Sequence, residues 1–222
     1  MTKAILYHNV LDDDEMKRVD PQRNTGWTTK SRFESGLLWL KAQGYKFITA
    51  DDYLKDVRYE KAVMITFDDG ALSIYDYAMD FMAKHGIMGT MFIHSAIIEN
   101  PNGRALTNMN GAQLKEMAQA GWAIGSHSHS HANLAKVEIQ RVMAEVIHSK
   151  NVIEEKTGKA CLHFATPYGA HSPAVIEQIM KYYKVHYSCD KHIDIEHSPR
   201  NNVGRWNISD ADINRLSEII NK

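Results

Sequence analysis

Short apolar segments alternate along the chain with longer segments in which apolar residues recur every three or four positions. Residues 4–10, 62–67 and 87–93 are mostly apolar runs of the length typical of β-strands. Residues 137–156 have the spacing of an amphipathic helix, and Gly158 follows them as a typical helix end. The alternation repeats roughly seven times, which predicts a parallel sheet covered by helices, either closed as a barrel or open and doubly wound.

The length of 222 residues favours one domain that spans residues 1–222. Residues 11–29 are polar and include a run of four acids, so we expect a long loop there that borders the functional groove. Other polar clusters follow directly after the expected strands. In a parallel barrel the positions after the strands meet at one rim, where active sites are built.

Two adjacent carboxylates, Asp68 and Asp69, end the apolar run 62–67. Burying such carboxylates costs on the order of several kcal/mol per ion unless a cation or hydrogen bonds compensate. The alternative is that they cap the helix that follows. The carboxylates therefore indicate a bound cation or a helix start at this position.

Three histidines, His127, His129 and His131, follow another expected strand. In a helical turn His127 and His131 would share a face and His129 would point elsewhere, whereas in an extended segment all three would share a face. The alternative is a histidine-rich solvent-exposed loop. One aspartate with two histidines is a set of ligands typical of zinc, and the second aspartate would then be free to act as a base on metal-bound water.

The overall composition excludes some classes of function. A net charge of −1 argues against binding nucleic acid by neutralising phosphates. No apolar run approaches the ~20 residues that a transmembrane helix needs. The start of the chain shows no signal peptide, which favours the cytoplasm as the sequence stands, or an extracytoplasmic location if a leader was removed. Cys161 and Cys189 lack metal-site spacing and are expected to be free thiols.

Three motifs together give the chain a family resemblance. They are Thr-Phe-Asp-Asp-Gly at 66–70, His-Ser-x-x-His at 127–131 and Phe-Ala-Thr-Pro-Tyr-Gly at 164–169. In this order and spacing the chain resembles the polysaccharide deacetylase family (carbohydrate esterase family 4, NodB homology domain), and it is most similar to the branch of poly-β-1,6-N-acetylglucosamine deacetylases. The resemblance implies an α/β fold, a distorted (β/α)7 barrel of the NodB type.

The resemblance also implies roles for individual residues. Asp69, His127 and His131 would bind a divalent metal, most simply Zn²⁺, with Co²⁺ or Ni²⁺ as alternatives. Asp68 would be the catalytic base. The backbone N–H of Tyr168 would stabilise the oxyanion, a contribution often worth roughly 3 kcal/mol.

Pro167 would fix the turn that aims the Tyr168 N–H, and both residues would border the substrate. The family often has arginine at the position of Ala165, where it orients the base. Arg205 is a candidate to supply that missing cation, and a surface arginine is the alternative. His8 would line the substrate site or lie in the core, and Trp206 would stack on sugar or pack in the core.

The family's late leucine-x-histidine motif, which carries the general acid, is not visible in this sequence. His186, His192 and His197 lie in that part of the chain, without the expected surroundings. The predicted function is a metal-dependent hydrolase that removes N-acetyl groups from an N-acetylated oligo- or polysaccharide through Asp68. The alternatives are hydrolysis of another small amide or formyl group, and a carbohydrate-binding protein that keeps the fold and metal with little turnover.

Overall fold

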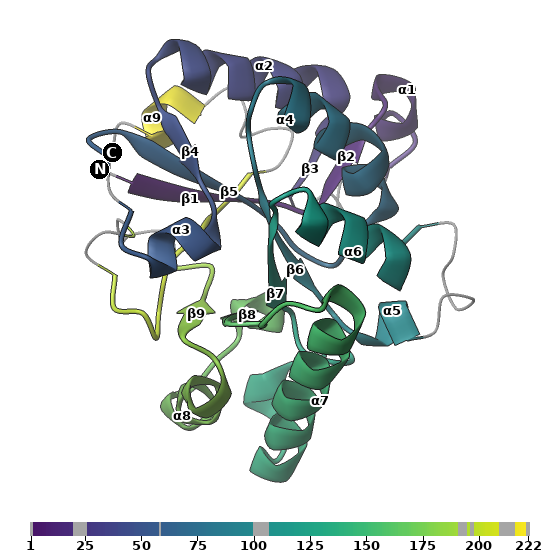
Figure 1. The fold of residues 1–222 in the computed structure, drawn as a ribbon, viewed down its shortest axis with the longest axis vertical. Coiled ribbons are helices and arrows are strands. Elements are labelled where there is room, and N and C mark those ends of the chain that lie inside the picture. Colours follow the sequence, from purple (N-terminus) through teal and green to yellow (C-terminus); the bar gives the residue numbers. More distant parts are fainter. Residues whose placement is uncertain are drawn as a thin grey trace.

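The computed structural model describes residues 2–19, 26–57, 59–99, 107–190, 195, 198–208 and 216–220. A central sheet runs through the molecule, and helices cover its outer side (Figure 1). In the part of the chain that the structure covers, every helix falls short of the length and apolar character needed to cross a bilayer.

The main sheet has eight strands, and all pairings between them are parallel. Its strands are β1 (Thr2–Tyr7), β4 (Lys46–Ile48), β5 (Ala62–Phe67), β6 (Thr90–Ile93), β7 (Ala123–Ser126), β8 (His163–Ala165), β9 (Val185–Tyr187) and β10 (Trp206–Asn207). The order is β10-β1-β5-β6-β7-β8-β9, and β4 pairs with the first half of β5. The parallel pairing confirms the parallel sheet expected from the alternating pattern.

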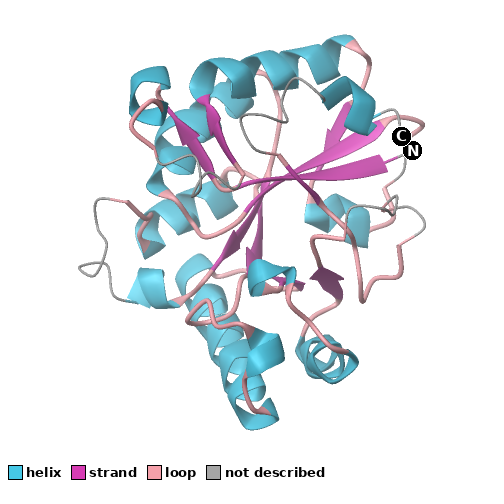
Figure 2. Cartoon of the chain, turned by 180° about the vertical axis from the view of Figure 1, so that it is seen from behind, coloured by secondary structure: helices cyan, strands magenta, loops and turns pink. Residues whose placement is uncertain are grey.

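The sheet curls so that its two ends approach each other. Val203 forms a bridge with Tyr187 of β9, and three residues later Trp206 pairs with Ile5 of β1. One segment therefore lies beside both the last and the first strand. Figure 2 shows the strands gathered at the centre with helices around them. The fold is the distorted barrel rather than an open doubly wound sheet.

Helices connect the strands along the outer side. The longer helices are α2 (Lys30–Ala42), α6 (Gly111–Gln119), α7 (Ile139–Thr157) and α8 (Pro173–Tyr182). The shorter ones are α1 (Asp13–Met16), α3 (Ala50–Leu54), α4 (Asp80–Lys84), α5 (Ala96–Glu99) and α9 (Leu216–Ile220), with a π-helical stretch over Ile74–Met79. As predicted, α7 ends at Gly158, which adopts the left-handed conformation (φ 69°) that terminates helices.

The prediction of a long loop over residues 11–29 is wrong for its two ends. Asp12 accepts a hydrogen bond from the Asp14 N–H, and Glu15 accepts one from the Asp12 N–H, so the acid cluster forms the first turn of α1. Strand β3 (Trp27–Thr29) then pairs in parallel with β2 (Asn9–Leu11). Residues 20–25 lie outside the described part.

Two layers of core lie on the two sides of the sheet. On β5, Val63 and Ile65 pack with the helices, whereas Ala62 and Met64 belong to a second cluster inside the barrel. Because side chains alternate along a strand, Asp68 continues the inward-facing series beyond the strand end. This alternation places the Asp68 carboxylate inside the barrel, just beyond the carboxyl end of β5, where the residue is 2% exposed. Both cysteines are free thiols, as predicted.

Candidate active site

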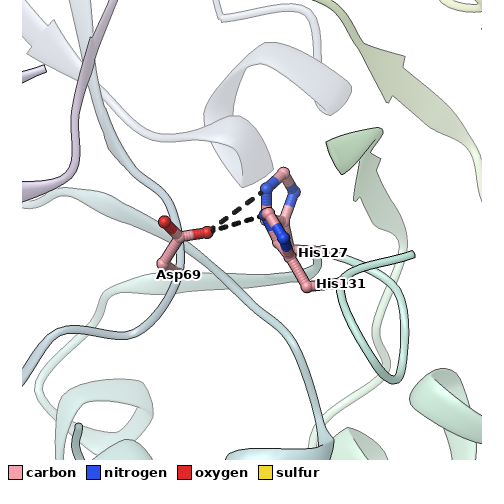
Figure 3. Close-up of side chains that lie close together, drawn as sticks. All are labelled: Asp69, His127 and His131. Atoms are coloured by element: carbon pink, nitrogen blue, oxygen red, sulfur yellow. Dashed lines mark ion pairs between the residues drawn. The ribbon is translucent and has the colours of Figure 1, made fainter. Parts of the chain in front are cut away.

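Asp69, His127 and His131 point toward one another at the carboxyl ends of β5 and β7 (Figure 3). The Oδ1 atom of Asp69 lies 3.1 Å from Nε2 of His131 and 3.5 Å from Nε2 of His127. Ligand atoms of a tetrahedral zinc site lie about 3.3 Å apart, because each is about 2.0–2.2 Å from the ion. The three side chains therefore have the spacing of a metal site.

Unusual backbone conformations bring these side chains together. Asp69 and the following Gly70 both have positive φ, 71° and 74°, so the chain turns sharply after β5. A Cβ at Gly70 would lie 2.7 Å from the side chain of Ile93, which leaves room only for glycine. In the histidine segment Ser128 and His131 also have positive φ, 65° and 59°. The segment is therefore neither of the two regular conformations considered from the sequence, although His127 and His131 converge and His129 points elsewhere.

The surroundings of His127 fix which of its ring nitrogens faces Asp69. Its Nδ1 lies 2.8 Å from the carbonyl oxygen of Ala165, which only accepts hydrogen bonds, so Nδ1 carries the hydrogen. Burial lowers the pKa of His127, against the opposing effect of Asp68 and Asp69. The ring is therefore neutral, with the lone pair of Nε2 directed at the site.

Asp69 has a buried oxygen that lacks a hydrogen bond. Its Oδ1, the atom nearest both histidines, has no hydrogen-bond partner among the described residues. Burial alone would raise the pKa of Asp69, but His131 and His127 hold that pKa far below its usual range. An ionised, buried carboxylate oxygen whose only close polar neighbours among the described residues are two imidazole nitrogens fits a divalent cation.

Asp68 lies beside this cluster and is held by Arg205. The guanidinium donates from Nη1 to Oδ1 (2.7 Å) and from Nη2 to Oδ2 (2.8 Å), and both side chains are buried. Burial alone would raise the pKa of Asp68, but Arg205 and then His127 hold that pKa below its usual range. Oδ2 of Asp68 is also 3.8 Å from Nε2 of His127. Asp68 is therefore an ionised carboxylate at the edge of the cluster.

Arg205 is enclosed within the barrel. It donates from Nε to the carbonyl oxygen of Ser188 (3.2 Å), and its guanidinium lies 4.9 Å from the ring centre of Phe92. Ala165, on β8, belongs to the same interior cluster as Phe92. The arginine is buried rather than at the surface, so its position agrees with the sequence-based hypothesis that it supplies a cation to Asp68.

Tyr168 lies in a tight 3-10 turn (Pro167–Gly169) that follows β8. The N–H groups of Gly169 and Ala170 donate to carbonyl oxygens within the turn, and the Tyr168 N–H takes no part in these two bonds. Tyr168 has a positive φ of 61°, and its side chain is 69% exposed with the ring 4.7 Å from that of His131. The turn thus presents an aromatic face beside the cluster, while Pro167 is buried.

His8 follows β1 and lies near the two aspartates. The backbone N–H of Asp68 donates to the carbonyl oxygen of Tyr7 (3.0 Å), which places the following residue, His8, beside Asp68. The backbone N–H of His8 donates to the carbonyl oxygen of Gly26, where an added Cβ would lie 2.2 Å from Nδ1 of His8. The imidazole is therefore half-buried against a glycine at the rim of the site. Trp206, on β10, is also half-buried.

His186 is the one residue of the three late histidines that the structure describes. It is fully buried, and its ring nitrogens contact the hydroxyl of Thr166 (3.2 Å) and the carbonyl oxygen of Asn201 (2.8 Å). Burial lowers the pKa of His186 to about 4. Both nitrogens are engaged, so His186 does not fit a general acid. His192 and His197 lie outside the described residues.

Glu145 on α7 is a residue that the sequence analysis missed. Its side chain is 1% exposed and accepts hydrogen bonds from the N–H groups of His129 and Ser130 and from the Ser130 hydroxyl. Arg141 contacts the same carboxylate at 2.6 Å. Glu145 therefore anchors the middle of the histidine segment. The feature of the sequence that could have revealed it is an acidic residue on the apolar side of an amphipathic helix.

Comparisons with known proteins agree with these observations. A sequence model of the family described as polysaccharide deacetylase matches residues 55–187. The putative polysaccharide deacetylase YxkH of Bacillus subtilis is 25% identical over 182 residues, which cover 80% of this chain and 60% of the relative. The poly-β-1,6-N-acetyl-D-glucosamine N-deacetylase of Staphylococcus aureus is 32% identical over 154 residues, or 64% of this chain and 53% of the relative. The chain thus spans less than two thirds of either relative.

Solved structures share the fold over almost the whole chain. The Streptococcus pyogenes deacetylase PplD, in complex with acetate, superposes with a TM-score of 0.86 at 18% identity, covering 99% of this chain and 97% of that one. IcaB from Ammonifex degensii superposes with a TM-score of 0.80 at 20% identity, covering 100% of this chain and 97% of that one. These likenesses confirm the NodB-type barrel. Since the family's sequence model matches more than half of its length, the chain belongs to the polysaccharide deacetylase family.

Proposed function

We propose that the chain is a metal-dependent hydrolase that removes N-acetyl groups from an N-acetylated oligo- or polysaccharide. The observation that carries this proposal is the arrangement of Asp69, His127 and His131 beside the Asp68–Arg205 pair. The two aspartates and the two histidines follow the carboxyl ends of β5 and β7, on the rim where barrel enzymes have their active sites, and Arg205, which directly precedes β10, pairs with Asp68 from inside the barrel. Residues 1–222 would act as a single catalytic domain.

Asp69, His127 and His131 would hold the ion. The set of one carboxylate and two imidazoles suits Zn²⁺, while Co²⁺ and Ni²⁺ take similar ligands. When bound, a divalent ion supplies Lewis acidity, which polarises a carbonyl group and makes water a better nucleophile at neutral pH. The hydrogen bond from His127 to Ala165 would keep the ligand nitrogen in place.

Asp68 would act as the general base. It is ionised because of Arg205 and lies next to His127, so it would be close to the water that attacks the amide. It would accept a proton from that water as the new C–O bond forms. General base catalysis of this kind contributes typically about 10²–10⁴-fold to the rate.

Tyr168 would have two roles, one for its backbone and one for its ring. Its N–H would donate to the carbonyl oxygen of the acetyl group as negative charge develops there, while Pro167 fixes the turn. Its exposed ring would stack against a sugar face. Trp206 would extend this wall on the side of β10.

His8 would complete the reaction as the proton donor. When the C–N bond breaks, the leaving sugar amine must gain a proton, and acetate is released. His8 is half-buried, follows the residue whose carbonyl oxygen accepts from the Asp68 N–H, and is not one of the three ligands. It would thus take the role of the late histidine that is not visible in the sequence, since His186, the one late candidate among the described residues, is engaged at both ring nitrogens.

The named relative from Staphylococcus aureus suggests which polymer to test first. Its name specifies poly-β-1,6-N-acetyl-D-glucosamine. We therefore choose β-1,6-linked oligomers of N-acetylglucosamine as the substrate for this chain. Oligomers with β-1,4 links provide the comparison.

The test is acetate release from these oligomers in the presence of zinc. Asp68→Asn should release acetate at least 100-fold more slowly than the wild type, whereas Asp80→Asn, an exposed aspartate on α4, should match the wild type. Equal rates for Asp68→Asn and the wild type would contradict the proposal. Oligomer binding without acetate release would indicate a carbohydrate-binding protein, and release from short non-sugar amides alone would indicate another hydrolase.

A further inference from the structure

A second cluster of metal-ligating side chains lies next to the candidate active site. Glu99, at the end of α5, lies between His129 of the histidine segment and His148 of α7. Its Oε2 is 3.1 Å from Nε2 of His148 and 3.4 Å from Nδ1 of His129. These separations bracket the about 3.3 Å expected between ligand atoms of a tetrahedral zinc ion.

The fold, rather than chance surface contact, holds the three residues together. Backbone N–H groups of Ser95 and Ala96 donate to the carbonyl oxygens of Ser128 and His129, which ties the start of α5 to the histidine segment. Glu145 anchors the same segment to α7, three residues before His148. Each ligand therefore comes from an element that is fixed relative to the other two.

The two imidazoles are arranged like ligands of one ion. Their ring centres are 4.4 Å apart and the rings are perpendicular, with an interplanar angle of 88°. A hollow lined by both histidines and by Asn151 opens onto them, and the His148 side chain is 52% exposed. An ion bound here would be accessible to solvent and could keep water as a further ligand. Two hydrogen bonds compete with an ion here: the Ser95 hydroxyl lies 2.9 Å from Nδ1 of His129, and Nε2 of His148 lies 3.1 Å from Oε2 of Glu99.

We propose that Glu99, His129 and His148 form a second binding site for a divalent transition metal, of the zinc type, separate from the site of Asp69, His127 and His131. Two imidazole nitrogens and one carboxylate oxygen are preferred by Zn²⁺, Ni²⁺ and Cu²⁺ over Mg²⁺ or Ca²⁺. Because its ligands are more exposed, this site binds more weakly than the first. His129 links the two, since it stands between His127 and His131 in the sequence.

Zinc content tests this proposal without reference to activity. Metal-free full-length chain is dialysed to equilibrium against zinc, and bound zinc is measured per chain. We expect two ions for the wild type, one for His148→Ala, one for Asp69→Asn and none for the double variant. His85→Ala, at the end of α4 and outside both clusters, should hold two.

Thermal unfolding provides a second readout. Zinc should raise the melting temperature of Asp69→Asn but not that of the double variant, because only a folded chain with an intact site gains stability from the ion. A His148→Ala chain that binds as much zinc as the wild type, whether that is one ion or two, would overturn the proposal. Loss of zinc from His148→Ala but not from Asp69→Asn would instead contradict the metal site of the proposed function.

Discussion

Arg205 donates two hydrogen bonds to Asp68, at 2.7 and 2.8 Å, across 137 residues of sequence. The pair lies inside the barrel, with exposures of 0% and 2% for the two side chains. Such a bidentate pair both fixes the orientation of the carboxylate and keeps it ionised. The orientation and charge of the proposed base therefore depend on the segment that leads into β10.

Replacing Arg205 by methionine should destabilise the fold. Removing one partner leaves the Asp68 carboxylate buried without its counter-charge, which costs roughly 3–5 kcal/mol. Urea unfolding of Arg205→Met against the wild type measures the difference. The double variant Arg205→Met/Asp68→Asn should recover part of the lost stability, and a single variant as stable as the wild type would contradict the inference.

Arg205→Lys should change the pH dependence of activity. Lysine keeps the charge but loses the two-point contact, so the pKa of Asp68 should rise toward its usual range. Asp68 acts as a base only when ionised, so the acidic limb of the kcat/KM profile should move to higher pH. An unshifted limb with unchanged kcat would show that Arg205 does not control Asp68.

Glu145→Gln should weaken metal binding although Glu145 touches no metal ligand atom. Glutamine cannot accept all of the hydrogen bonds that hold His129 and Ser130, so the segment carrying His127 and His131 should loosen. Losses of such supporting contacts typically cost about 10–100-fold in metal affinity. Zinc titration measures this, with Glu155→Gln, an exposed glutamate on the same helix, as the control expected to match the wild type.

The sequence could place Asp68, Asp69 and His127 near one another because each directly follows a strand, and parallel strands end at the same rim. It could not determine the conformation of the histidine segment, which depends on positive φ at Ser128 and His131 and on contacts with Glu145. Those features arise from tertiary packing, which leaves no local signal.

The sequence named Arg205 as a candidate cation for the base, but its two-point pairing with Asp68 could not be derived from a local pattern. The pairing requires the segment around Val203 to close the barrel between β9 and β1, and nothing near Arg205 in the sequence indicates that register. The first turn of α1 was missed for another reason. Its acids look like a solvated loop, whereas Asp12 and Glu15 form a capping box that starts a short helix.

We expect a pH dependence of stability from Asp51, in the first turn of α3. Oδ1 of Asp51 lies 2.8 Å from Nε2 of buried His163, and this hydrogen bond is the main reason that the pKa of Asp51 is lowered. A lowered folded-state pKa adds stability above the unfolded value of 3.8, and the gain is lost as pH falls below it. The free energy of unfolding of the wild type minus that of Asp51→Asn should thus shrink between pH 5 and about 3. A difference that stays constant over this range would contradict the assignment.

Tyr168 should contribute to substrate binding through its ring. Tyr168→Phe keeps an aromatic face and should retain KM, whereas Tyr168→Ala should raise KM about 5-fold, in line with roughly 1 kcal/mol for an aromatic contact. Both variants keep the backbone N–H, so kcat should change little. Tyr59→Ala removes another exposed aromatic ring and serves as the control. A fall in kcat with unchanged KM would contradict a stacking role.

The metal dependence of the reaction is measured by acetate release from metal-free protein, followed as zinc is restored. We expect no release from N-acetylglucosamine oligomers after chelation, recovery when zinc fills the site of Asp69, His127 and His131, and no recovery in Asp69→Asn. Release at the wild-type rate from protein shown to be free of metal, or from Asp69→Asn, would contradict this expectation.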